Sequence, residues 1–276
     1  MHARVLTPRW RSQALGRDKR VNVVLPEGFT EEGPRYPVLY LLHGYGAGRD
    51  TWLRQTRLLD ALKGFRLIVV LPESGRRWLI NDHVGLRYED YVIHDLVPAV
   101  DKHFPTLADR SARAIGGFSM GGATAMFLAL RHRSLFGAVA SYAGAFEAPH
   151  RTGDPYAAHR GEPDFVMPTV ESHERVWGPP GSATRRRYDP YQLIEAPSTA
   201  LPPAFHLDDG TQDHDRMVRM SRAVREALDR RGWPVEYHER PGGHDWEYVD
   251  AALPASLEFL SRNLTGVAED SVVPRP

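Results

Sequence analysis

The stretch AIGGFSMGGATAM, residues 114–126, decides the fold class of this 276-residue chain. It begins with small and β-branched residues, places glycines on both sides of Ser119, and continues as an Ala- and Met-rich helical pattern. Residues 117–121 match the motif G-x-S-x-G, in which a sharp turn from strand to helix holds a serine in a strained conformation that flanking side chains would obstruct. Such a turn places the hydroxyl above a sheet at a helix N-terminus, where backbone N–H groups and the helix dipole stabilise a developing anion.

Short apolar runs on both sides of this turn predict a mostly parallel sheet. Residues 38–42 and 67–71 are apolar at every position, as expected for parallel strands that helices cover on both faces. The predicted strands are 36–44, 65–73, 112–119, 136–144, 203–210 and 234–243.

Helical patterns alternate with these strands. Apolar residues recur at three- and four-residue spacing in 88–104, 121–133, 216–232 and 248–264. This alternation predicts an α/β fold with a doubly wound, mostly parallel sheet in one domain, residues 1–276. Residues 20–29 resemble an antiparallel edge strand, and Pro98 and Pro254 are expected to start or kink helices.

One segment does not follow the alternation. Residues 146–191 are rich in Pro, Gly, His and Arg, and only 170–177 has a helical pattern. Because long irregular segments in compact domains commonly cover a site, we interpret 146–191 as a cap over the carboxyl edge of the sheet. Its candidate metal ligands have no recognisable ligand spacing, and its arginine run is expected to face water. The candidate ligands are His150, Asp154, His159 and His173, and the arginine run is Arg185 to Arg187.

The chain also contains the partners that a serine nucleophile requires. A serine hydroxyl becomes nucleophilic when an imidazole takes its proton and a carboxylate orients that imidazole. His244 follows the predicted strand 234–243, and Asp213 follows the predicted strand 203–210. Both would lie at strand carboxyl ends, as Ser119 does. Three neighbouring carboxylates remain alternatives to Asp213, namely Asp208, Asp209 and Asp215.

A third element of the site is expected from the glycine-rich segment LLHGYGAG, residues 41–48. Its glycines allow the backbone N–H of Tyr45 to point inward beside that of Met120, so that the two amides form an oxyanion hole. His43 is interpreted as a structural residue that hydrogen-bonds this loop. The chemistry needs neither a cofactor nor a metal ion.

These motifs resemble those of the esterase D type of serine esterase, a family of α/β hydrolases that includes small-acyl esterases, feruloyl esterases, S-formylglutathione hydrolases and mycolyltransferases. The segments are 36–52 (YPVLYLLHGYGAGRDTW), GFSMGG, RYDPYQL and GGHDWEYV. The resemblance implies an α/β-hydrolase fold, with Ser119 as nucleophile, Asp213 as acid and His244 as base. It also implies that 73–82 lines the substrate pocket, with Trp78 as a wall and Asp82 as a substrate contact, although loop packing explains these two equally well.

Composition excludes several function classes. The formal net charge is +0, so no basic field attracts nucleic acid or an anionic membrane surface. The chain has no cysteine, which excludes disulfides, thiolate metal sites and a cysteine nucleophile. No run approaches the ~18 apolar residues of a membrane span, and no apolar leader is present at the N-terminus, so we expect a cytoplasmic protein.

The sequence therefore predicts a serine esterase that hydrolyses small esters of short or aryl acyl groups through an acyl-enzyme. Two alternatives remain open. One is an acyltransferase in which a sugar or another alcohol replaces water, and the other is a catalytically silent fold that serves as a binding module. The pattern does not indicate an oligomeric state.

Overall fold

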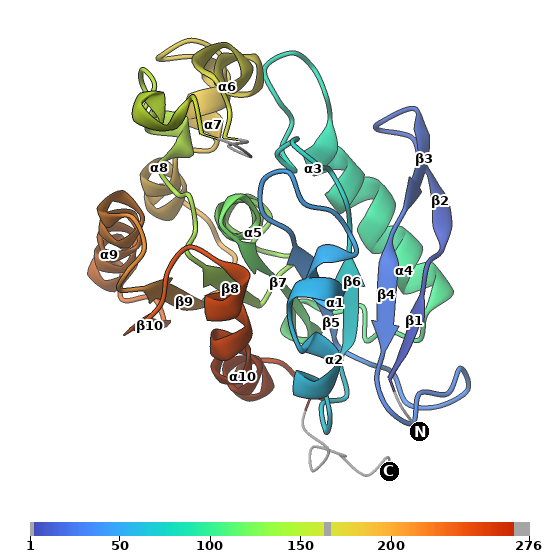
Figure 1. Ribbon diagram of the computed structural model, residues 1–276. Coiled ribbons are helices and arrows are strands. Elements are labelled where there is room, and N and C mark those ends of the chain that lie inside the picture. The colour runs from blue at the N-terminus through green and yellow to red at the C-terminus, as the bar shows by residue number, and fades with distance from the viewer. Residues whose placement is uncertain (1–2, 163–166, 268–276) are drawn as a thin grey trace.

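An eight-stranded sheet runs through the centre of the molecule, seen in a computed structural model that describes residues 3–162 and 167–267 (Figure 1). In spatial order its strands are β1 (Arg4–Leu6), β4 (Asn22–Leu25), β6 (Ile68–Leu71), β5 (Val38–Leu42), β7 (Arg113–Phe118), β8 (Ala138–Tyr142), β9 (Ala204–Gly210) and β10 (Val235–Arg240). Six neighbouring strands are mutually parallel, which confirms the predicted mostly parallel sheet. They are β6, β5, β7, β8, β9 and β10.

The N-terminal strands differ from the prediction. β4 is antiparallel to β6 as expected, but it is not the edge strand, because β1 pairs with its other side. β1 is only three residues long and largely exposed, so it leaves no hydrophobic pattern in the sequence. A separate antiparallel ribbon of β2 (Arg9–Ser12) and β3 (Arg17–Arg20) was also not predicted.

Helices cover both faces of the sheet. They are α1 (Thr51–Gln55), α2 (Leu58–Ala61), α3 (Tyr88–Asp90), α4 (Val97–His103), α5 (Met120–Arg131), α6 (Val170–Trp177), α7 (Ala183–Arg187), α8 (Pro190–Glu195), α9 (Asp215–Arg230) and α10 (Trp246–Asn263). A π-helical segment, Tyr91–Leu96, joins α3 to α4, and short 3₁₀ turns occupy Arg110–Ala112, Ala148–His150 and Ala157–His159. Pro98 lies just after the π-helical segment, in a helical run that is continuous from α3 to α4, so its missing N–H removes a hydrogen bond from that run. Pro254 lies inside α10.

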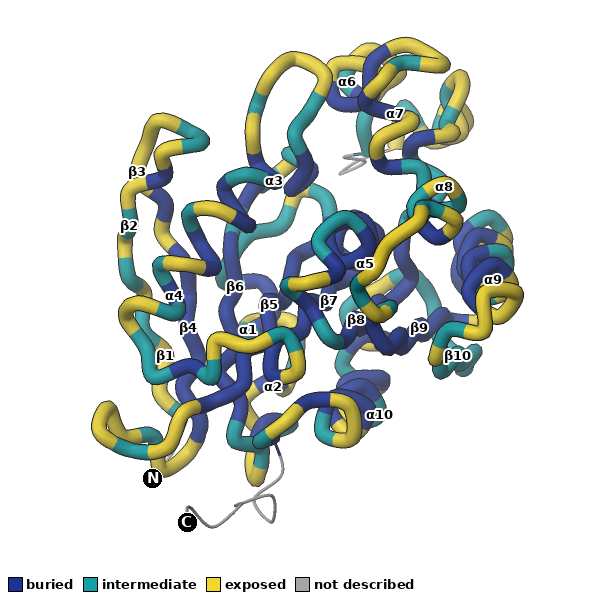
Figure 2. Tube along the Cα trace, turned by 180° about the vertical axis from the view of Figure 1, so that it is seen from behind, coloured by how far each residue is buried: buried dark blue, intermediate teal, exposed yellow. Residues whose placement is uncertain are grey.

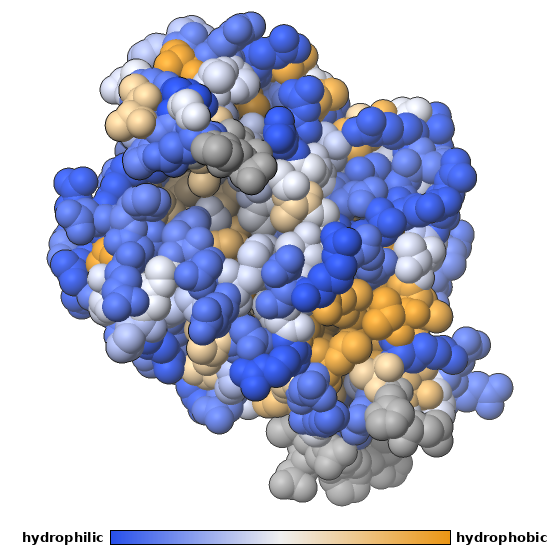
Figure 3. Space-filling model, in the orientation of Figure 1, coloured by the Kyte–Doolittle hydropathy of each residue, from blue (hydrophilic) through white to orange (hydrophobic). Residues whose placement is uncertain are grey.

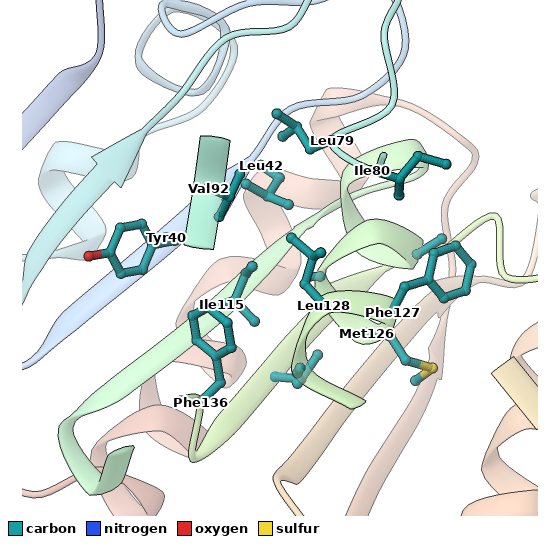
Figure 4. Packing of buried hydrophobic residues seen from close by; sticks show 14 of the residues in the cluster. Tyr40, Leu42, Leu79, Ile80, Val92, Ile115, Met126, Phe127, Leu128 and Phe136 are labelled. Carbon is teal, nitrogen blue, oxygen red and sulfur yellow. The ribbon is translucent and has the colours of Figure 1, made fainter. Parts of the chain in front are cut away.

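Alternate residues of each central strand enter different cores. In β5, Tyr40 and Leu42 pack in the core beneath α4, α5 and α9, whereas Leu39 and Leu41 pack in the core beneath α1, α2 and α10. Figure 4 shows Leu42 close to Leu128 of α5 in the first core. This double burial explains why the strand is apolar at every position, and Figure 2 shows the buried strands enclosed by helices with exposed outer faces.

The cap, residues 146–191, lies beside the carboxyl ends of the strands (Figure 1) and contains α6, α7 and two 3₁₀ turns. The predicted helix at 170–177 is present as α6. Arg185 is buried within the cap, which differs from the expectation that the arginine run faces water. Its guanidinium donates to the carbonyl oxygens of Gly178 (2.9 Å), Pro149 (3.0 Å) and Arg151 (2.6 Å), so one cation replaces the backbone partners that a helix or sheet would provide.

A buried tyrosine anchors the cap to the rest of the fold. The Tyr188 hydroxyl donates to Glu89 and accepts the N–H of Asn81 at 2.9 Å. Glu89 also binds Arg131 and His132 at the end of α5. Burial alone would raise the pKa of Glu89, but these hydrogen bonds lower it to about 2, so the carboxylate stays charged and holds the contact.

None of the helices in residues 3–162 and 167–267 has the length and apolar character that a membrane span requires.

Candidate active site

The turn at residues 117–121, called the serine turn here, places Ser119 between β7 and α5. Ser119 has φ +54° and ψ −112°, a backbone conformation that non-glycine residues rarely adopt. A Cβ at Gly117 would lie 2.7 Å from the carbonyl oxygen of Leu42, and a Cβ at Gly121 would lie 2.5 Å from the same atom. The glycines are therefore required because the turn presses against the backbone of β5.

Three predicted residues form one hydrogen-bonded chain. His244 Nε2 lies 2.9 Å from Ser119 Oγ, and His244 Nδ1 lies 2.7 Å from Asp213 Oδ2. The Asp213 side chain is fully buried and that of His244 is 16% exposed, so water has little access to the contact between them. This arrangement allows the imidazole to take the serine proton while the carboxylate fixes its tautomer.

Two loops that touch each other hold the acid and the histidine. The N–H of Gln212 donates to the carbonyl oxygen of Gly242 at 2.9 Å. A Cβ at Gly210 would lie 2.2 Å from the same oxygen, so only glycine permits this approach. The ring of Phe118 lies 4.8 Å from the ring of His244, so packing as well as hydrogen bonding sets the orientation of the imidazole.

The alternative carboxylates have other environments. Asp208 Oδ2 accepts from Arg240 Nε at 3.0 Å, and its other oxygen accepts from the Tyr248 hydroxyl. Asp209 is fully buried, and burial raises its pKa well above the usual value. Asp215 begins α9. Among the described residues, Asp213 is the carboxylate that makes the hydrogen bond with His244 Nδ1.

His43 and the loop that follows it line the other side of Ser119. His43 is fully buried and accepts the N–H of Ser74 at Nε2 (2.9 Å), so its Nδ1 carries the proton and donates to the Gly44 carbonyl oxygen (2.7 Å). Burial lowers its pKa, which keeps the ring neutral. These bonds agree with the expected structural role in shaping the loop that contains Tyr45.

A cavity of about 730 Å³ opens beside Ser119, and Figure 3 shows the surface hollowed beneath the cap. Tyr45, Met120 and Trp78 line it together with Ser119 and His244. Met120 is the first residue of α5, so its N–H has no partner within the helix.

The two predicted pocket residues differ in their position relative to the cavity. Trp78 is 7% exposed and packs edge-on against Trp177 at 4.8 Å, so the cap supports the wall that Trp78 forms. Asp82 is not among the residues that line the cavity. Its carboxylate accepts the N–H of Leu86 at 2.8 Å and closes a surface turn, which agrees with loop packing, and a contact with substrate stays a prediction.

Sequence reasoning missed the contribution of α9. His214, Arg216, Met217 and Met220 line the cavity. The guanidinium of Arg216 lies 5.1 Å from the centre of the Tyr156 ring in the cap. No local signal reveals this, because a helix that closes a cavity has the same apolar spacing as one that only covers a sheet.

The candidate metal ligands of the cap do not converge. His150 Nε2 binds Asp189 at 2.9 Å, and His159 Nδ1 binds Glu162 at 2.8 Å. His173 is buried beside α7, where burial followed by the charges of Arg151 and Arg185 lowers its pKa to about 3. The sequence expectation of no metal site in the cap therefore remains our interpretation.

Comparison with known proteins identifies the relatives of this chain. The model of a family described as "Putative esterase" matches residues 12–260. Esterase Rv1288 of Mycobacterium tuberculosis strain H37Rv is 30% identical over 254 residues, which cover 86% of this chain and 54% of that protein. The chain thus spans about half the length of this relative.

Solved structures share the fold. The fluorophosphonate-binding serine hydrolase FphF of Staphylococcus aureus superimposes with a TM-score of 0.80 at 23% identity, covering 94% of this chain and 99% of that one. A ferulic acid esterase superimposes with a TM-score of 0.77 at 23% identity, covering 96% and 100%. These likenesses confirm the predicted α/β-hydrolase fold.

Proposed function

The chain belongs to the esterase family whose model matches residues 12–260, and from this premise we propose that it is a serine hydrolase of small carboxylic esters. The observation that carries the proposal is the hydrogen-bonded chain from Asp213 through His244 to Ser119 at the wall of a cavity. An ester of a short or aryl acyl group suits a cavity of about 730 Å³, and the structural likeness to a ferulic acid esterase and the family resemblance favour the same class.

The reaction begins with attack by Ser119. As Ser119 Oγ bonds to the carbonyl carbon, His244 Nε2 takes the hydroxyl proton and the carbonyl π electrons move onto oxygen. The Tyr45 and Met120 amides are proposed to donate to this oxyanion, at the positive end of α5. Collapse expels the alcohol, which receives the proton from His244, and leaves an acyl-serine.

Water completes the cycle by the same route. His244 removes a proton from water, the resulting hydroxide equivalent attacks the acyl-serine, and Ser119 Oγ leaves with the proton as the free acid is released. Asp213 accepts the Nδ1–H of His244 and thereby stabilises the imidazolium. Trp78 and the cap are proposed to hold the acyl group, since both face the same cavity as Ser119.

Pre-steady-state hydrolysis of p-nitrophenyl esters, from acetyl to long-chain acyl, together with methyl ferulate, tests this proposal. We expect a burst of about one nitrophenolate per active site, followed by slower turnover. Ser119→Ala should remove the burst and reduce kcat by about 10⁶-fold, whereas the exposed control Ser198→Ala should behave as the wild type. A fluorophosphonate probe should label the wild type and not Ser119→Ala.

Two outcomes would contradict the proposal. Unchanged turnover by Ser119→Ala would assign the chemistry to another residue. Absence of both turnover and labelling in folded wild-type protein would favour a silent binding module. Added alcohol that diverts the acyl group into a new ester would instead assign acyl transfer through the same acyl-serine.

A further inference from the structure

β9 and β10 carry a second group of polar side chains, on the face of the sheet that α10 covers. His206 on β9 is paired in register with Glu236 on β10. His238 follows two residues later and therefore shares the face of Glu236. One potential ligand atom from each of the three residues lies within 4.8 Å of the others. None of the three is among the residues that line the catalytic cavity.

The buried member of this group lacks ordinary partners. The His206 side chain is fully buried, and neither of its ring nitrogens makes a hydrogen bond. Nε2 lies 3.3 Å from Asp208 Oδ2, within the range of an ion pair but without hydrogen-bond geometry. Since buried polar groups are nearly always bonded, an imidazole left unsatisfied beside two potential ligands points to a missing partner.

The chemistry of the three donors indicates what that partner is. Two imidazole nitrogens and one carboxylate oxygen form a ligand set that suits zinc and similar divalent transition metals. The ring centres of His206 and His238 lie 5.0 Å apart on neighbouring strands, so the two imidazoles can reach the same ion.

Binding requires small movements that the structure permits. Neighbouring donors around a tetrahedral zinc ion lie about 3.4 Å apart, so the three side chains must close by up to about 1.4 Å. Glu236 is paired with Arg262 at 2.9 Å, and that pairing has to be released. The Arg262 side chain is 54% exposed, so it can turn into solvent.

We propose that His206, Glu236 and His238 bind a divalent transition-metal ion of the zinc class, with water in the fourth position. β10 is the outermost strand of the sheet and has one neighbour, β9. The loops that follow these two strands contain Asp213 and His244. An ion bound across them would fasten the edge strand and stabilise the part of the fold that supports both residues.

Zinc binding to chelator-treated, tag-free protein tests the site. Calorimetric titration with ZnCl₂ should give one site, CoCl₂ should produce the visible absorption of a four-coordinate ion, and MgCl₂ should not bind. Zinc at 100 times its Kd should raise the Tm by about 5 °C. His238→Ala and Glu236→Gln, both half-buried positions on β10, should each weaken binding at least about tenfold.

The matched control is His94→Ala, which removes an exposed histidine outside the group and should bind zinc as the wild type does. A wild type that binds no zinc stoichiometrically would overturn the proposal. So would variants of Glu236 and His238 that bind as tightly as His94→Ala. Because these measurements use no ester, their failure would leave the proposed hydrolase activity untouched.

Discussion

The two sides of the candidate catalytic cavity are built in different ways. On the sheet side, Ser119, Asp213 and His244 lie in short connections between a strand and a helix, and glycines bring the backbones into contact. On the cap side, short turns depend on the Arg185 guanidinium and on the Tyr188 hydroxyl.

This difference teaches where precision and adaptability lie. Short connections that a strand and a helix fix at both ends hold side chains within a fraction of an ångström, as the proposed catalysis requires. Polar contacts between side chains and irregular backbone fix only the enclosure around the acyl group, so a single substitution can reshape it. Changes on the sheet side should therefore affect the chemical step or folding, and changes on the cap side should affect substrate preference.

The largest effect is expected at the acid on the sheet side. Asp213→Asn should lower kcat for p-nitrophenyl acetate by about 10⁴-fold, because an amide favours the wrong tautomer of His244. Asp209→Asn is the matched control. Its carboxyl is fully buried with a raised pKa, so the neutral amide closely resembles it and activity should persist. Equal losses in both variants would contradict the assignment, because the hydrogen bond to His244 comes from Asp213 and not from Asp209.

Glycine substitutions compare the packing of the two sides. Gly121→Ala would place a Cβ 2.5 Å from the Leu42 carbonyl oxygen and 2.6 Å from that of His43, neither of which can move freely. We expect a loss of about 3 kcal/mol or more in the free energy of unfolding. Gly161→Ala in the cap meets no atom within 4 Å and should change it by less than about 0.5 kcal/mol. Urea denaturation measures the free energy of unfolding of both variants. Similar losses would mean that the sheet side is packed no more tightly than the cap.

The cap arginine should affect substrate preference. Arg185→Met removes donors to three carbonyl oxygens and loosens the cap. We expect kcat/KM to fall about tenfold for methyl ferulate, equivalent to ~1.4 kcal/mol, with kcat for p-nitrophenyl acetate nearly unchanged. Exposed Arg186→Met in the same helix is the control. A parallel fall for both esters would show that the cap also positions the reacting atoms.

The most gradual effect concerns pH. The pKa of His173 is lowered to about 3 in the folded state, mainly by burial, whereas an unfolded histidine titrates near about 6.5. Between these values the unfolded chain binds the extra proton, so stability falls as the pH drops through this window, by at most about 1.4 kcal/mol per pH unit.

His173→Gln should make this dependence shallower between pH 6.5 and 4.5 in urea denaturation. His94→Gln controls for the loss of a histidine as such, because that residue is exposed and lies outside the cap. An unchanged slope in His173→Gln would mean that the cap opens before His173 is protonated.

Sequence alone predicted the sheet side well. Residues buried on both faces of a strand must all be apolar, and a helix must repeat its apolar face, so β5, β7 and α5 are readable from local patterns. The glycines around Ser119 are equally informative, since their requirement comes from a close backbone approach.

The contacts within the cap and the α9 residues that line the cavity could not be predicted from the sequence, because these contacts join residues far apart in the chain. Arg185 resembles a solvated charge until the carbonyl oxygens 34 and 36 residues earlier in the chain are brought to it. Asp82, for which substrate contact and loop packing were equal alternatives, closes a turn onto Leu86, a common use of aspartate in loops. The α9 residues in the cavity, Met217 among them, have the periodicity of any packed helix.

The hydrogen bond between Ser119 and His244 joins residues 125 positions apart. Contacts of such long range form slowly, because the loop between them must lose its conformational freedom before the contact contributes any stability. The proposed activity therefore cannot precede completion of the sheet out to β10, whatever local structure forms earlier. During refolding, the return of the proposed ester hydrolysis would therefore report when this 125-residue loop closes.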